Sequence, residues 1–138
     1  MPEQATPRDA GATAIRIAAW VAIAAAVVGV FSTWASDGPV TLNGTQGPNN
    51  GWLVLIVAAF ALGWTRSMNR GSWVGVAGVL GASVVMAWTA IENWRDNQDV
   101  LGATASHGLL LVVAAGVVLA GAAVARGAEL ARRRRRDV

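Results

Sequence analysis

The stretch Ile17-Ala-Ala-Trp-Val-Ala-Ile-Ala-Ala-Ala-Val-Val-Gly-Val-Phe31 decides the fold of this chain. Small and weakly polar residues extend it to Ala35, which brings it close to the roughly 20 residues that a helix needs to cross a hydrocarbon core about 30 Å thick. Lipid offers no hydrogen-bond partner to the backbone, so a run of this composition is satisfied there only as a helix. The stretch therefore predicts a transmembrane helix.

Three further apolar runs follow, at residues 52–65, 73–91 and 108–125. The first of them is the shortest, and Arg66 must extend it by reaching toward the headgroups. We expect helices at residues 14–35, 51–67, 72–95 and 105–130, with a polar N-terminal tail at 1–13 and a basic C-terminal tail at 131–138. The predicted fold class is all-α, a single integral membrane four-helix bundle.

A cleaved signal peptide is the alternative for the first run. Arg8 and Arg16 would supply its charged region, and Thr33-Trp34-Ala35 is a poor version of its cleavage site. Because the apolar stretch is long for a signal, the transmembrane interpretation is favoured.

The composition supports a membrane protein. Of 138 residues, 54% are hydrophobic and 14% are charged, whereas a soluble domain this small needs more polar residues to cover its surface. The chain has no Cys, which excludes disulfides and thiolate chemistry. Its basic residues are all Arg, and the abundance of Ala, Gly and Val indicates a GC-rich bacterial genome, so we expect a multi-pass protein of the bacterial inner-membrane type.

Two independent patterns predict the orientation. Ten of the eleven Arg, all but Arg95, fall at or beyond the helix ends on one side of a four-span chain, which by the positive-inside rule places both termini in the cytoplasm. The tryptophans are expected to form two interfacial belts. Trp34, Trp52, Trp88 and Trp94 would lie at the outer boundary, and Trp20, Trp64 and Trp73 at the inner one.

The basic C-terminal run is predicted to anchor the chain at the membrane surface. Its residues are Arg132, Arg133, Arg134, Arg135 and Arg136. Each would attract anionic lipid headgroups at the cytoplasmic face by about 1 kcal/mol. No aromatic residues alternate with these arginines, so nucleic acid is not an expected partner.

Small residues recur four apart on the helices, as in Gly71 and Gly75, Gly78 and Ala82, and Gly116 and Ala120. Such spacing lets membrane helices approach closely. We favour packing within one bundle. The alternative is contact with a second copy or another membrane protein, most readily through the third helix.

No pattern of catalytic or cofactor-binding residues is present. Ser106 and His107 are neighbours on a helix start and do not face each other as nucleophile and base. Glu92, Asp96 and Asp99 would share a helix face and are weak candidates for a metal site, but Arg95 lies among them. We therefore expect a solvated, partly ion-paired helix end, with no metal and no cofactor.

The middle of the predicted spans carries no ionisable residue, which argues against proton-coupled transport. The membrane Glu of small multidrug transporters and the motif of small fluoride channels are both missing. Hydroxyls such as Ser83 are expected to bond their own helix backbone. The connection from Ser36 to Asn50 is long, and its Asn43-Gly44 pair predicts a short hairpin.

The run from Phe31 to Trp52, with Trp34, Asn43-Gly44 and Gly51-Trp52, resembles small Trp-containing four-helix membrane proteins of actinobacteria whose role is uncharacterised. That resemblance implies a fold but assigns no functional residues. The layout is also similar to claudins by analogy only, because their loop cysteines are absent.

These patterns favour a non-enzymatic accessory or scaffold protein that acts through helix–helix packing. The alternative is a small pore or carrier for an uncharged solute, lined by hydroxyls near Ser83. A lipid-modifying enzyme that uses Glu92, Asp96 and His107 at the outer face ranks third.

Overall fold

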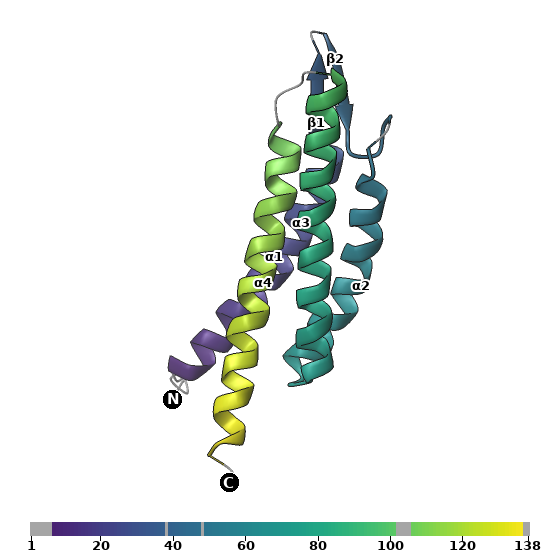
Figure 1. Ribbon diagram of the computed structural model, residues 1–138. Helices are drawn as coiled ribbons and strands as arrows, with labels where there is room; N and C mark the ends of the chain where they lie inside the picture. The colour runs from purple at the N-terminus through teal and green to yellow at the C-terminus, as the bar shows by residue number, and fades with distance from the viewer. Residues whose placement is uncertain (1–6, 38, 48, 102–105, 137–138) are drawn as a thin grey trace.

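The computed structural model describes residues 7–37, 39–47, 49–101 and 106–136. Its helices are α1 (Pro7–Phe31), α2 (Gly51–Asn69), α3 (Trp73–Leu101) and α4 (His107–Arg134), and a hairpin of β1 (Thr33–Asp37) and β2 (Val40–Asn43) separates α1 from α2. The helices lie side by side with the hairpin at one end (Figure 1). α1 and α3 each pack against both α2 and α4, so the order around the bundle is α1, α2, α3, α4.

All four helices are long and apolar enough to cross a membrane. α2 is the shortest of them, with 19 residues. At about 1.5 Å per residue it is roughly 28 Å long, close to the thickness of a hydrocarbon core. The structure thus confirms the predicted all-α chain with four helices of membrane-spanning length.

Glycines let the helices approach closely. A Cβ at Gly75 of α3 would overlap the backbone of Met68, and a Cβ at Gly78 would overlap the ring of Trp64. On α4, Gly116 lies against the carbonyl of Ser83. These glycines therefore serve packing inside the bundle, where only a missing side chain leaves room for the neighbouring helix.

The turn between α2 and α3 is closed by a Schellman motif. Gly71 has a φ of 88°, a conformation that glycine adopts without steric cost. The N–H of Gly71 donates to Met68 O (2.9 Å) and that of Ser72 donates to Ser67 O (3.2 Å). Both bonds satisfy carbonyls at the end of α2, so the chain reverses within a few residues.

Some predicted helix bounds are wrong. α1 begins at Pro7 instead of residue 14, because Pro fits the first turn of a helix, and it ends at Phe31 instead of residue 35. Residues 33–35 leave the helix because they pair with β2, with Thr33 opposite Asn43. α3 continues past residue 95 to Leu101, and α4 continues past residue 130 to Arg134.

A hairpin is present, but its turn is not at Asn43-Gly44. Asp37 lies opposite Val40, so the strands reverse between those two residues, and Asn43 ends β2. The side chain of Asn43 accepts a hydrogen bond from the N–H of Thr45 (3.0 Å), and the N–H of Gly44 donates to Val30 O (2.8 Å). The Asn43-Gly44 pair thus turns the chain back onto the end of α1 instead of closing the hairpin.

Candidate functional site

Trp34 is the centre of the hairpin end of the bundle. The residue has 0% exposure, and its Nε1 donates to Gly29 O at 2.8 Å. A Cβ at Gly44 or at Gly108 would overlap its ring, so the loop and α4 both lie directly on the indole. One aromatic side chain therefore fastens α1, the loop and the start of α4 together.

This burial corrects the prediction that Trp34 belongs to an interfacial belt. Trp52, Trp73, Trp88 and Trp94 are exposed on the bundle, and Trp20 and Trp64 are partly buried. The Trp64 ring stacks on Phe60, with centroids 5.7 Å apart. Trp34 differs because β1 folds it under the loop, where protein atoms surround its ring.

A chain of asparagines joins the loop to α3. The N–H of Asn50 donates to Asn93 Oδ1 (3.0 Å), and Asn93 Nδ2 donates to Thr89 O (2.7 Å). Asn97 Nδ2 donates to Asn49 Oδ1 at 3.3 Å, and Asn49 Nδ2 donates to Asn43 O at 3.0 Å. Asn49, Asn93 and Asn97 are each buried. These amides satisfy one another and the backbone, so they stabilise the loop and leave little capacity for a ligand.

The sequence interpretation missed this cluster. Asn93 and Asn97 are four residues apart and lie on the buried face of α3, whereas Glu92 and Asp96 lie on its exposed face. The spacing of the two asparagines by four residues, which places them on one helix face beside the charged face, is the signal that would have found it.

The predicted carboxylate face has the expected position without the expected pairing. Glu92, Asp96 and Asp99 are all exposed on α3. Glu92 accepts a hydrogen bond from Trp88 Nε1 (3.1 Å). Within the described part of the chain, Arg95 forms no ion pair, and no three His, Cys, Asp or Glu side chains come together as a metal site. The prediction of a partly ion-paired helix end is therefore wrong for Arg95, and the exposure of the three carboxylates is as expected.

Ser106 and His107 are not arranged as a nucleophile and its base. The hydroxyl of Ser106 donates to the carbonyl of Thr33, which ties α4 to β1. His107 follows it as an exposed side chain at the start of α4. Ser106 is thus used in folding, and its hydroxyl is already engaged by a partner other than the imidazole.

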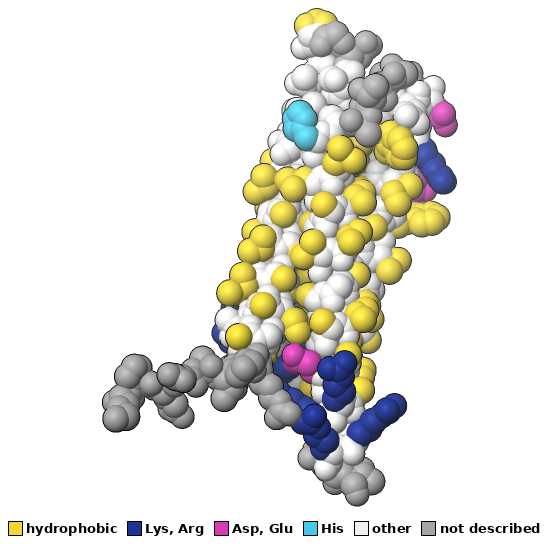
Figure 2. Space-filling view, turned by 90° about the vertical axis from the view of Figure 1, so that its left-hand side faces the viewer, with side chains coloured by type: hydrophobic (Ala, Val, Ile, Leu, Met, Phe, Trp, Pro, Cys, Tyr) yellow, Lys and Arg dark blue, Asp and Glu magenta, His cyan; other side chains and the backbone are white. Residues whose placement is uncertain are grey.

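Arginines gather at the opposite end of the bundle, where Figure 2 shows dark blue side chains around the end of α4. Arg132, Arg133, Arg134, Arg135 and Arg136 are all exposed there. Arg126 differs, because its side chain is only 11% exposed. It donates from Nη1 to Glu129 Oε2 (2.6 Å), from Nη2 to Asn69 O (3.1 Å) and from Nε to Met68 O (3.4 Å).

Arg126 therefore joins α4 to the carboxyl end of α2. Two helices that otherwise scarcely touch meet through one guanidinium, which also neutralises the negative end of the α2 dipole. Sequence reasoning counted Arg126 only as a topology signal, because nothing in its neighbourhood along the chain identifies α2 as its partner.

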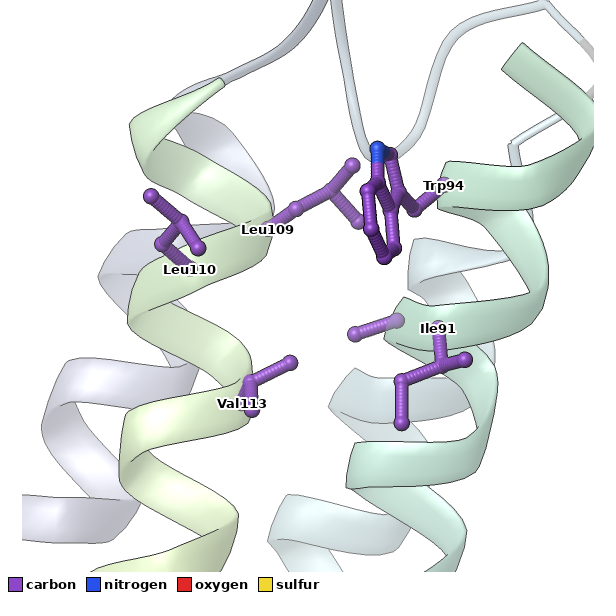
Figure 3. Close-up of a pocket in the computed structure, with 6 residues that line it drawn as sticks. Ile91, Trp94, Leu109, Leu110 and Val113 are labelled. Carbon is purple, nitrogen blue, oxygen red and sulfur yellow. The ribbon is translucent and has the colours of Figure 1, made fainter. Parts of the chain in front are cut away.

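An apolar crevice lies between α3 and α4 near the hairpin end, where the indole of Trp94 on α3 extends toward Leu109 on α4 (Figure 3). Its volume is about 80 Å³, and it is lined by Ala90, Ile91, Trp94, Leu109, Leu110 and Val113. None of these side chains can ionise or act as a nucleophile, so the crevice offers only contact with methyl or methylene groups.

A second hollow, of about 170 Å³, lies at the Arg-rich end. Its lining comes from α1, α2 and α4, and comprises Ala12, Thr13, Arg16, Asn69 and Arg126. It differs from the crevice because two arginines, an asparagine and a threonine are among the residues that line it.

The middle of the bundle is filled with aliphatic side chains. Val79, Ala82, Met86, Val112 and Leu119 are each at most 2% exposed. Ser83 is buried among these helices, and its hydroxyl donates to Leu80 O at 2.7 Å. This bond to its own helix is the arrangement expected from the sequence.

Comparisons with known proteins give no relative from which a role could be transferred. No protein-family model, no curated protein and no solved structure matches this chain.

Proposed function

We propose that this chain is a multi-pass protein of the cell membrane, of the bacterial inner-membrane type, and that it acts as a non-enzymatic accessory or scaffold component through helix–helix packing. The observation that carries the proposal is the closed aliphatic core. Val79, Met86 and Leu119 are at most 2% exposed at its centre, and Ser83 bonds its own helix.

The proposed orientation places both termini in the cytoplasm. It is supported by the distribution of arginines in the described ranges. Arg66 and Arg70 lie at the same end as Arg126 and the arginines that follow it, whereas Arg95 lies near the other end, among Glu92, Asp96 and Asp99. Short segments rich in Arg are retained in the cytoplasm during insertion.

A scaffold must leave helix surface free for partners, and three glycines provide it. A Cβ built at Gly63 on α2, at Gly81 on α3 or at Gly121 on α4 meets no atom within 4 Å. Unlike Gly75 and Gly78, these positions face away from the bundle. A transmembrane helix can therefore approach the backbone at each of them. We propose α3 around Gly81 as the contact surface, and a second copy of the chain as the first partner to test.

Cysteine crosslinking in native membranes tests this surface, because the chain has no Cys of its own. The variant Gly81→Cys should form a disulfide-linked dimer on oxidation. The variants Gly63→Cys and Gly121→Cys report on α2 and α4 in the same way. The matched control is Ala82→Cys, at the neighbouring position with 2% exposure, which should stay monomeric. If all four stay monomeric and no membrane protein co-purifies, the scaffold proposal is rejected.

The pore or carrier alternative predicts a different result. Liposomes containing the protein would release a small uncharged solute faster than empty liposomes, and Ser83→Val would slow that release. The bond of Ser83 to Leu80 O and the aliphatic side chains around it give this alternative no support. We therefore expect equal release with and without the protein.

A further inference from the structure

We propose that the polar hollow at the Arg-rich end binds a phosphate group, carried by a membrane lipid headgroup or free in the aqueous phase. The hollow is lined by Ala12, Thr13, Arg16, Asn69 and Arg126 and is named here the arginine pocket. The proposal requires that this end of the bundle meets water or headgroups. It does not depend on the scaffold role.

The charge of the pocket favours an anion. Glu129 is paired with Arg126, so this pair is neutral, and Arg16 forms no ion pair within residues 10–36, 39–47, 49–99 and 106–136, whose side chains the structure describes. Among these described side chains, Arg16, Arg126 and Glu129 leave a net charge of +1 at the pocket. An anion in the pocket would offset that positive charge.

The donors of the pocket are suited to phosphate oxygens. Arg126 has five N–H groups, of which three bond Glu129, Met68 and Asn69. One N–H on each terminal nitrogen remains. Arg16 contributes a second planar fork, the type of group that recognises phosphate in a bidentate manner. Thr13 and Asn69, which carry a hydroxyl and an amide, also line the hollow, so residues with donor groups line it from three helices.

The volume and the position of the arginine pocket are both suited to a phosphate group. A volume of about 170 Å³ far exceeds the roughly 15 Å³ that one water molecule needs. The pocket includes Asn69, the last residue of α2, and thus lies where that helix ends. In a chain that crosses a bilayer, helix ends of this kind lie at the level of the lipid phosphates.

The lipid arm of the test uses the full chain and native mass spectrometry. The protein is released from vesicles of phosphatidylcholine that contain rising fractions of phosphatidylglycerol. We expect the wild type to retain one phosphatidylglycerol and Arg16→Gln to retain it about tenfold more weakly, because one charge-assisted contact is lost. The matched control is Arg132→Gln, which removes the same charge from an exposed position at the same end. It should bind like the wild type.

The phosphate arm titrates inorganic phosphate into the protein in a neutral detergent by calorimetry. Binding to the wild type that Arg16→Gln weakens assigns the pocket to the phosphate group alone. Retention of lipid without binding of phosphate assigns it to a headgroup held by its chains. Arg16 is exposed, so circular dichroism should show Arg16→Gln folded. Equal loss in Arg16→Gln and Arg132→Gln, equal binding in wild type and Arg16→Gln, or no binding in either arm overturns the proposal.

Discussion

At the scale of single residues, Trp34 joins the end of α1 to the loop through both its ring and its Nε1. Its surroundings are contributed by segments distant in sequence, including Gly44 and Gly108. A tryptophan close to a predicted membrane boundary is compatible with a lipid belt and with burial under a loop. Only the tertiary contacts distinguish the two, which is why the belt prediction was wrong for Trp34. For the other tryptophans the belt stays a prediction.

Two replacements of Trp34 should destabilise the bundle to different extents. Trp34→Phe removes the hydrogen bond from Nε1 to Gly29 O, which then keeps only the N–H of Ser32 (3.2 Å) as a donor, so the loss should be about 0.5–1.5 kcal/mol. Trp34→Ala also leaves a cavity and should cost about 3–5 kcal/mol. The measurement is the free energy of unfolding in detergent. Trp52→Phe, at a side chain 54% exposed, is the control and should change stability by less than about 0.5 kcal/mol. An equal loss in both Phe variants would contradict the role given to Trp34.

The asparagine chain makes a second prediction at this scale. Asn93→Ala removes the acceptor of the Asn50 N–H, which should cost about 1–3 kcal/mol and speed hydrogen exchange at the Asn50 amide. Gln98→Ala, on the exposed face of the same helix, should change neither quantity. Unchanged exchange at Asn50 in the Asn93 variant would show that the loop is held by other contacts.

At the scale of elements, the four helices were predictable because long apolar runs leave few alternatives to a helix. The ends of those helices were not predictable to the residue. Residues 33–35 extend the apolar run of α1 in composition, yet they enter β1 because Asn43 and the residues before it supply a partner strand. The sequence at Asn43-Gly44 indicates that the chain turns there. It does not indicate that the N–H of Gly44 donates to Val30 O at the end of α1, because that contact depends on the tertiary fold.

The contact between α2 and α3 should be sensitive to one methyl group. Gly75→Ala places a Cβ against the backbone of Met68, which cannot rotate away, so we expect a loss of about 1–3 kcal/mol in detergent. Gly81→Ala, on the same helix, meets open space and should be neutral or slightly stabilising, since Ala favours helix over Gly. Comparable losses of stability in the two variants would mean that replacing any glycine of α3 is costly, and that overlap with the backbone of α2 is not the cause.

At the scale of the whole molecule, the two ends of the bundle have different chemistry. The hairpin end is a network of amides and one buried indole, with Arg95 and the carboxylates on its surface. The other end holds the arginine pocket and the exposed arginines of α4. The separation of charge was visible in the sequence. The pocket was not, because Arg16 and Arg126 are 110 residues apart along the chain and meet only through folding.

This separation carries the last prediction, on how the bundle is oriented. Single cysteines are introduced as Gln98→Cys near the hairpin end and as Arg136→Cys at the other end, both at exposed positions of a chain without native Cys. In intact bacterial cells stripped of their outer wall, a membrane-impermeant maleimide should label Gln98→Cys, because short segments with few arginines are translocated. It should label Arg136→Cys only after the membrane is permeabilised. Labelling in the reverse order would place the arginine pocket outside the cell, and labelling of both before permeabilisation would contradict four spans.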